Sequence, residues 1–153
     1  MLLERKIINK LKRWKEETNG SKALLIEGAR RIGKSTSVVE FAEKEYDSYL
    51  LIDFSIAPKE IKEYFEKYVT DLDTLFMLLS AHYKVQLITR RTLIIFDEVQ
   101  FCPKAREAIK YLVEDRRYDY IETGSLISVK ENVKNILIPS EERHIKMYPL
   151  DFE

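Results

Sequence analysis

Hydrophobic residues recur along this chain in two alternating patterns, continuous runs and helical spacings. The continuous runs predict buried strands at residues 22–27, 48–54, 92–96 and 118–122. The helical spacings predict helices at residues 3–17, 35–45, 58–68, 75–83 and from Pro103 onward. Strands that alternate with helices are typical of a parallel sheet with helices on both faces. Two weaker segments, residues 136–138 and 145–148, compete for the last strand of a mostly parallel, five-stranded sheet in a three-layer α/β domain.

Proline and aspartate mark where three of these helices begin. Pro58 and Pro103 each fit the first helical position, because proline has no N–H to leave unpaired there. Asp71 or Asp73 can cap the helix over residues 75–83, since a carboxylate accepts from the N–H groups of the first turn. These residues predict separate helices between the second and third strands.

The composition limits the classes of protein that fit. The chain has 153 residues, which suits one domain, and its 26 acidic and 26 basic side chains exclude a strong overall attraction to nucleic acid or anionic lipid. Cys102 is the only cysteine, so an internal disulfide and a thiolate zinc site are excluded, and a small buried filler is favoured. No apolar run approaches the ~20 residues that span a bilayer. We expect a cytoplasmic protein with no membrane partner.

The stretch between the first strand and the next helix reads G-x-x-x-x-G-K-S at residues 28–35. This pattern is typical of a phosphate-binding loop, in which backbone N–H groups and a helix N-terminus surround the anion. Lys34 can lie along the β- and γ-phosphates, and the Ser35 hydroxyl can complete the coordination of Mg²⁺. The predicted nucleotide-binding residues are Gly28, Ala29, Arg30, Arg31, Ile32, Gly33, Lys34, Ser35 and Thr36.

Two acids follow the buried strand 92–96 directly. Asp97 is placed to hold Mg²⁺, usually through its waters, and Glu98 is placed to polarise an attacking water. A loop that only bound nucleotide would need the first acid but not the second. Asp97 and Ser35 are therefore the expected metal residues. Glu98, Lys34 and Thr123 are the expected catalytic residues.

Other polar residues end neighbouring strands. In P-loop ATPases with an added strand between the loop strand and the Asp-Glu strand, a polar residue at the position of Thr123 or Ser125 reaches the γ-phosphate or the water. We favour Thr123, and the alternative is a glycine turn with capping hydroxyls. Asp53 ends the second strand, where a loop cap is favoured over a ligand.

Five sequence blocks together resemble a known family. They are GARRIGKST, LLIDFS, LIIFDEVQ, YIETGSLIS and MYPLDFE. The chain resembles a prokaryotic AAA-type P-loop ATPase family, in which this module precedes a C-terminal region of poorly defined function. The resemblance implies ATP at residues 28–35, Mg²⁺ assistance from Asp97, catalysis by Glu98 and a sensor at Thr123 or Ser125. Gln100 matches the glutamine after the acidic pair, and its role is open.

In the family that the chain resembles, the block at residues 147–153 joins the ATPase part to the C-terminal region, and this chain stops inside it. We therefore expect residues 1–153 to be an ATPase module that stops before the lid and the C-terminal domain, and that is weakly active alone. Arg143 is a candidate for reaching a neighbouring subunit's γ-phosphate, although a surface arginine paired with Glu141 and Glu142 is favoured.

The sequence favours Mg²⁺-dependent ATP hydrolysis coupled to a protein partner, a homo-oligomer or a conformational change. GTP is disfavoured, because no Asn-Lys-x-Asp element is present. One alternative is a nucleotide-dependent switch or scaffold with little turnover. Another is an ATP-driven nucleic-acid module, motivated by the basic first helix, with Lys6, Lys10 and Lys12, and by the adjacent arginines 30–31.

Overall fold

The computed structural model describes residues 2–28, 34–124 and 142–147. Their elements, in chain order, are α1 (Leu2–Thr18), β1 (Ala23–Gly28), α2 (Lys34–Glu45), β2 (Ser48–Asp53), α3 (Lys59–Lys67), α4 (Leu72–Tyr83), β3 (Thr92–Asp97), the single-turn helix η1 (Val99–Phe101), α5 (Pro103–Asp115), β4 (Asp119–Gly124) and β5 (Glu142–Met147). The described helices include none that is both long enough and apolar enough to cross a membrane.

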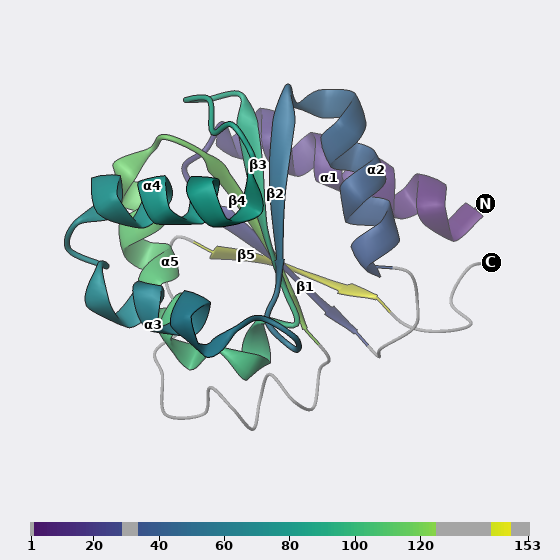
Figure 1. The fold of residues 1–153 in the computed structure, drawn as a ribbon. Helices are drawn as coiled ribbons and strands as arrows, with labels where there is room; N and C mark the ends of the chain where they lie inside the picture. The colour runs from purple at the N-terminus through teal and green to yellow at the C-terminus, as the bar shows by residue number, and fades with distance from the viewer. Residues whose placement is uncertain (1, 29–33, 125–141, 148–153) are drawn as a thin grey trace.

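The five strands form one sheet in the order β2-β3-β4-β1-β5, and each neighbouring pair is parallel. Helices α1 and α2 cover one face of this sheet, and α3, α4 and α5 cover the other (Figure 1). The predicted three-layer α/β fold with a parallel, five-stranded sheet is therefore confirmed. Parallel strands need long crossover connections, which explains why helices separate the strands along the chain.

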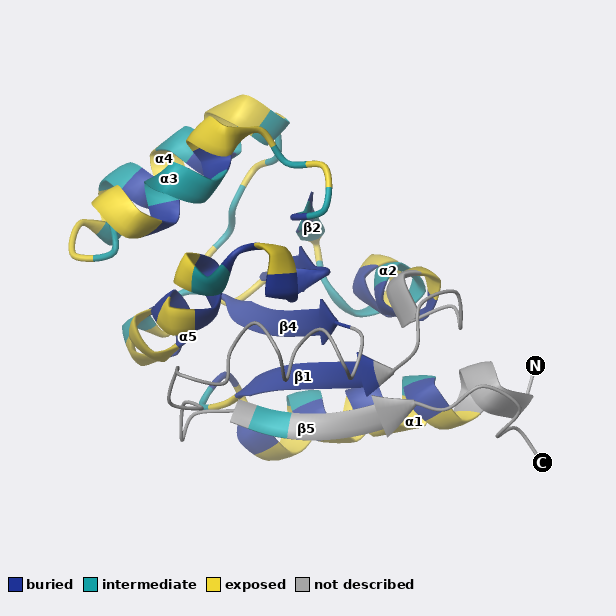
Figure 2. Cartoon of the chain, turned by 90° about the horizontal axis from the view of Figure 1, so that it is seen from below, coloured by how far each residue is buried: buried dark blue, intermediate teal, exposed yellow. Residues whose placement is uncertain are grey.

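Each face of the sheet supports its own hydrophobic core. On the side of α3, α4 and α5, the rings of Phe54, Phe65 and Phe96 meet edge to face, with centroids 5.3–5.6 Å apart. On the other side, Leu11 and Trp14 of α1 pack with residues of α2 and the sheet. All six residues of β3 and of β4 are buried, as strands covered on both faces require (Figure 2).

Helix α1 buries the described part of the apolar stripe that its sequence predicts. Ile7, Leu11 and Trp14 are at most 3% exposed. The Trp14 indole N–H also donates to the carbonyl of Lys22 at 2.9 Å, so the helix is tied to the turn that leads into β1. This packing agrees with the expectation that α1 belongs to the domain.

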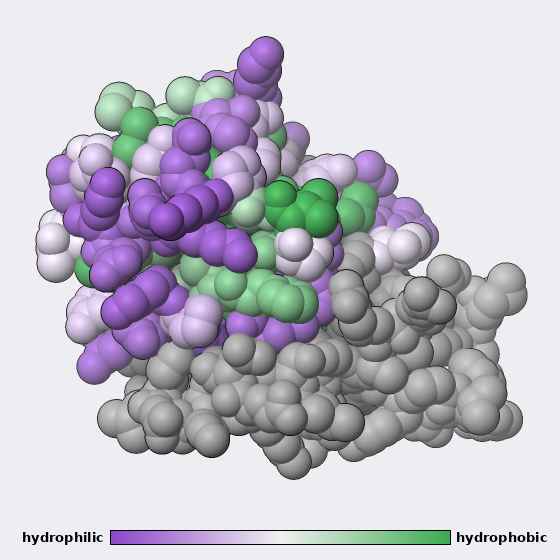
Figure 3. Space-filling view, turned by 60° about the horizontal axis from the view of Figure 1, so that its bottom comes forward, coloured by the Kyte–Doolittle hydropathy of each residue, from purple (hydrophilic) through white to green (hydrophobic). Residues whose placement is uncertain are grey.

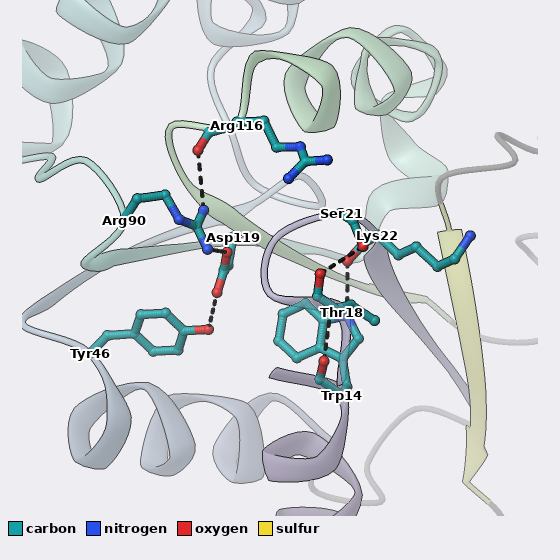
Figure 4. A network of polar contacts seen from close by, with 8 residues as sticks. All are labelled: Trp14, Thr18, Ser21, Lys22, Tyr46, Arg90, Arg116 and Asp119. Atoms are coloured by element: carbon teal, nitrogen blue, oxygen red, sulfur yellow. Dashed lines mark hydrogen bonds and ion pairs between the residues drawn. The ribbon is translucent and has the colours of Figure 1, made fainter. Parts of the chain in front are cut away.

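Polar contacts hold the edge of the sheet where the strands begin (Figure 4). Asp119, at the start of β4, accepts hydrogen bonds from the Tyr46 hydroxyl at 2.5 Å and from the Arg90 guanidinium at 2.7 Å. Gly20 lies against the same guanidinium with a φ of +85°, and a Cβ there would come within 2.6 Å of Arg90 Nη2. The network joins α2, the chain before β3, and β4 at the amino ends of the strands.

The structure corrects the predicted start of one helix, decides between two candidate caps for a second, and confirms the start of a third. Pro58 is the N-cap of α3 and not its first helical residue, because its ψ of 151° is extended and the helix begins at Lys59. Asp71, and not Asp73, caps α4, and its side chain accepts from the Thr74 N–H. Pro103 begins α5 at the first helical position, as predicted.

The ends of the last strands also differ from the prediction. Strand β4 continues through Gly124, because Ile26 and Glu27 of β1 pair with Thr123 and Gly124. The last strand is β5, which contains most of the weak segment 145–148 and starts earlier. The competing segment 136–138 lies outside the described residues.

Candidate functional site

The glycine-rich stretch has the backbone setting that its motif requires. Strand β1 ends at Gly28, and α2 begins at Lys34, so the motif joins a strand to a helix N-terminus. A helix N-terminus presents unpaired N–H groups to an anion. Thr36, in the first turn of α2, is exposed. Five predicted nucleotide-binding residues lie outside the described residues: Ala29, Arg30, Arg31, Ile32 and Gly33.

The acidic pair lies at the same edge of the sheet as this motif. Asp97 is the last residue of β3, and β4 lies between β3 and β1. In this order one strand, β4, is added between the loop strand β1 and the Asp-Glu strand β3, as predicted with Thr123 as a sensor. Since all three strands are parallel, their carboxyl ends meet at one edge. Three residues therefore lie at this edge: Asp97 is the last residue of β3, Gly28 is the last residue of β1, and Thr123 is one residue before the end of β4.

Thr123 connects the two acids. Its hydroxyl donates to Asp97 Oδ1 at 2.5 Å and accepts from the backbone N–H of Glu98 at 3.1 Å. Thr123 is fully buried, and Asp97 and Glu98 are each 7% exposed. A buried hydroxyl used as donor and acceptor fixes both neighbours. Ser125, the other candidate, lies outside the described residues.

Glu98 has an unusual backbone and a fixed side chain. Its φ of 54° and ψ of 53° lie in the left-handed region, which costs a side-chain-bearing residue ~1–3 kcal/mol. Its carboxylate Oε1 accepts a hydrogen bond of 2.7 Å from the amide Nε2 of Gln100. Strained conformations of this kind cluster at functional sites, where the surrounding contacts maintain them.

A buried ion pair supports this edge from the opposite face of the sheet. Arg106 Nη1 of α5 lies 3.2 Å from both carboxylate oxygens of Glu122, and the two side chains are at most 1% exposed. Glu122 directly precedes Thr123, so the pair anchors α5 to the end of β4. Sequence reasoning missed it, although one signal was available: a glutamate and an arginine at positions where the apolar pattern predicts core.

A family model described as an AAA domain matches residues 20–153. The chain belongs to the AAA-type P-loop ATPase family. Membership supports a nucleotide-binding, ATPase-type function. This AAA domain is also similar to a chain in the structure of C. elegans PCH-2, with 13% identity and a TM-score of 0.46, over 94% of this chain and 42% of that one. Among curated proteins, none matches its sequence.

Asp53 of this AAA domain is a loop cap, as the sequence favoured. Its Oδ1 accepts from the backbone N–H of Ser55 at 3.0 Å and from the Ser55 hydroxyl at 2.6 Å. Its strand position pairs with Asp97 of β3 in the register of the sheet. The carboxylate therefore stabilises the turn that follows β2.

Arg143 is a partly exposed arginine on β5. It forms an ion pair with Glu17 of α1 at 2.7 Å, whereas the sequence favoured Glu141 and Glu142 as partners. Successive side chains of a strand point to opposite faces, which makes a partner one residue away unfavourable. The observed pair instead fixes β5 to α1.

The remaining candidates have ordinary surroundings. Cys102 is 3% exposed within the core, and burial raises the pKa of its thiol, so it is the small filler that the sequence favoured. His82 is exposed, and the described residues contain no cluster of three or more acids, histidines or cysteines that could hold a metal. Lys6, Lys10 and Lys12 are exposed on α1.

The described surface on the side where the strands end is largely hydrophilic, with a small hydrophobic area (Figure 3). Two exposed large apolar side chains follow neighbouring strands: Ile56, after β2, is 80% exposed, and Phe101, after β3, is 44% exposed.

Proposed function

We propose that this AAA domain binds ATP with Mg²⁺ and hydrolyses it by in-line attack of water on the γ-phosphorus. One observation carries the proposal: Thr123 holds Asp97 and the Glu98 backbone at the sheet edge where β1 leads into the glycine-rich motif. Phosphoryl transfer depends mainly on positioning and on charge stabilisation, so a fixed pair of acids beside a phosphate-binding loop suits it.

The phosphates would be bound by residues 28–36. The N-terminus of α2 favours an anion, and Lys34 would add a positive charge at the β- and γ-phosphates. Glycine at positions 28 and 33 of the motif would keep side-chain bulk away from the phosphates.

Asp97 and Ser35 are the residues that would hold Mg²⁺. Oxygen donors suit this cation, and the hydrogen bond from Thr123 fixes the orientation of the Asp97 carboxylate. When bound, the metal neutralises negative charge on the β- and γ-phosphate oxygens. The residues present fit this role by donor type and by their place at the carboxyl edge.

Glu98 would act as the general base. The oxygen of water forms a bond to the γ-phosphorus while the bond to the leaving oxygen of ADP breaks, and the Glu98 carboxylate accepts a proton from the water. Thr123 would report the state of the γ-phosphate to the acids that it contacts.

Calorimetric titration with ATP tests the binding half of the proposal. Lys34→Ala is expected to weaken ATP binding at least ~10-fold, because a charge at the phosphates is lost. Lys44→Ala, at an exposed position in the last turn of α2, is the matched control and should bind as wild type does. Equal affinities for both variants would contradict the phosphate-binding assignment.

Steady-state phosphate release tests the hydrolysis half. Sustained turnover by the wild-type domain supports the ATPase. Tight binding followed by a single burst without further turnover would instead favour the nucleotide-dependent switch, which uses the same residues.

A further inference from the structure

We propose that Gln100 is a positioning residue that orients the Glu98 carboxylate for hydrolysis, an inference that rests on the proposed function. Gln100 lies in η1, the turn between β3 and α5, and its side chain is 1% exposed. Its amide Nε2 donates to Glu98 Oε1 at 2.7 Å. A hydrogen bond to a carboxylate is shorter and stronger than one between neutral groups, so this contact fixes the orientation of the acid.

The backbone of this turn is held on both sides of Gln100. The Glu98 N–H donates to Thr123 Oγ1, and the Glu98 carbonyl accepts from the Phe101 N–H, each at 3.1 Å. The left-handed conformation of Glu98 is therefore maintained by contacts that do not involve its side chain. The Gln100 amide, in contrast, contacts the Glu98 carboxylate itself.

The carbonyl oxygen of the Gln100 side chain argues against a purely structural role for this residue. Its Oε1 is buried and has no hydrogen-bond partner within the described part of the chain. A buried acceptor without a partner lowers stability, and an apolar side chain of similar size would fill the space without that penalty. Packing alone does not explain a glutamine at this position, whereas its contact with Glu98 does.

Orientation matters because a general base has to lie within hydrogen-bonding distance of the proton that it accepts. A glutamate side chain has three rotatable bonds, and a displacement of about 1 Å at a reacting group can lower a rate ~100-fold. Gln100 restricts those rotations through its hydrogen bond to Glu98 Oε1. Its effect should therefore fall on kcat and leave ATP binding unchanged.

Two variants test the role. Gln100→Leu removes the donor with little change in size, and Gln100→Glu replaces it with a second acid beside Glu98. Each is expected to lower kcat at least ~10-fold, while the Kd for ATP stays within about twofold of wild type. Cys102→Ala, which changes a buried side chain at the end of the same turn, is the control and should keep the wild-type kcat. Thermal unfolding of each variant shows that the comparison is made on folded protein.

A double-variant cycle with Glu98→Gln separates this inference from the proposed function. If Gln100 acts through Glu98, adding Gln100→Leu to Glu98→Gln should cause no further loss of rate. Wild-type kcat in both folded Gln100 variants, together with an inactive Glu98→Gln, would overturn the positioning role alone. Wild-type kcat in Glu98→Gln would overturn the proposed base, and this inference with it. If Gln100→Leu does not fold, the kcat of Gln100→Glu tests the positioning role in its place, and a wild-type value overturns that role.

Discussion

Thr123 donates a hydrogen bond of 2.5 Å to Asp97, across the boundary between β4 and β3. Thr123→Val keeps the shape of the side chain but removes this bond and the acceptor for the Glu98 N–H. Because these groups are buried, we expect a loss of ~1–3 kcal/mol in the free energy of unfolding and a lower kcat. Urea unfolding and steady-state hydrolysis measure the two effects.

Thr123→Ser is the matched control for the hydroxyl. It keeps the donor and acceptor and loses only a methyl group, which costs about 1 kcal/mol when buried. It should retain most of the wild-type kcat. Equal kcat values for the serine and valine variants would show that the hydroxyl is not needed.

Tyr120 carries a buried hydroxyl with no hydrogen-bond partner within the described residues. Tyr120→Phe removes an unsatisfied polar group without removing the ring, so we expect stability equal to wild type or higher by up to ~1 kcal/mol. Tyr46→Phe, which loses the hydrogen bond to Asp119, should instead destabilise the fold by about 1–2 kcal/mol. If Tyr120→Phe were the more destabilising of the two by urea unfolding, the buried hydroxyl would have a partner.

Lys84 is an exposed residue in the left-handed conformation, with a φ of 57°, at the C-cap of α4. Lys84→Gly relieves the contact between Cβ and the backbone, and this gain is partly offset by the greater freedom of glycine in the unfolded chain. We expect a net stabilisation of about 0.5 kcal/mol. Lys84→Ala keeps the Cβ and should show no such gain; a gain equal to that of glycine would assign the effect to the lost charge.

Alkaline pH should destabilise the domain through Tyr46, which is partly buried. Burial, followed by the neighbouring Asp119, raises the pKa of Tyr46 far above its ordinary value of 10. Above about pH 10 the Tyr46 hydroxyl loses its proton in the unfolded chain but keeps it in the folded chain. The contribution of Tyr46 to the free energy of unfolding is therefore complete below that pH and declines above it by ~1.4 kcal/mol per pH unit. Tyr46→Phe should reduce that slope in urea unfolding, and an unchanged slope would contradict the shift.

Most of the fold could be predicted because its signals are local. Continuous apolar runs predicted the strands of a sheet that is covered on both faces. Helical spacing predicted the buried stripe of Ile7, Leu11 and Trp14 on α1. The start of α3 was misplaced by one residue because proline suits both the N-cap and the first helical position, and only the observed ψ of Pro58 distinguishes them.

The candidate site was predictable as a set of residue types but not as a set of contacts. The acidic pair located Asp97 and Glu98, and the polar end of the strand at residues 118–122 located Thr123. The spacing of Thr123 along the chain does not show that it contacts both acids. The hydrogen bond from Gln100 to Glu98 depends on the left-handed backbone of Glu98, which no sequence pattern signals for a glutamate.

The account depends most directly on Glu98 as the base that accepts a proton from the attacking water. ATP affinity and steady-state hydrolysis of Glu98→Gln, measured beside wild type on the same preparation, test this role. Glutamine keeps the size of the side chain but cannot accept that proton, so we predict wild-type affinity and a kcat at least ~100-fold lower. Hydrolysis at the wild-type rate would contradict the account.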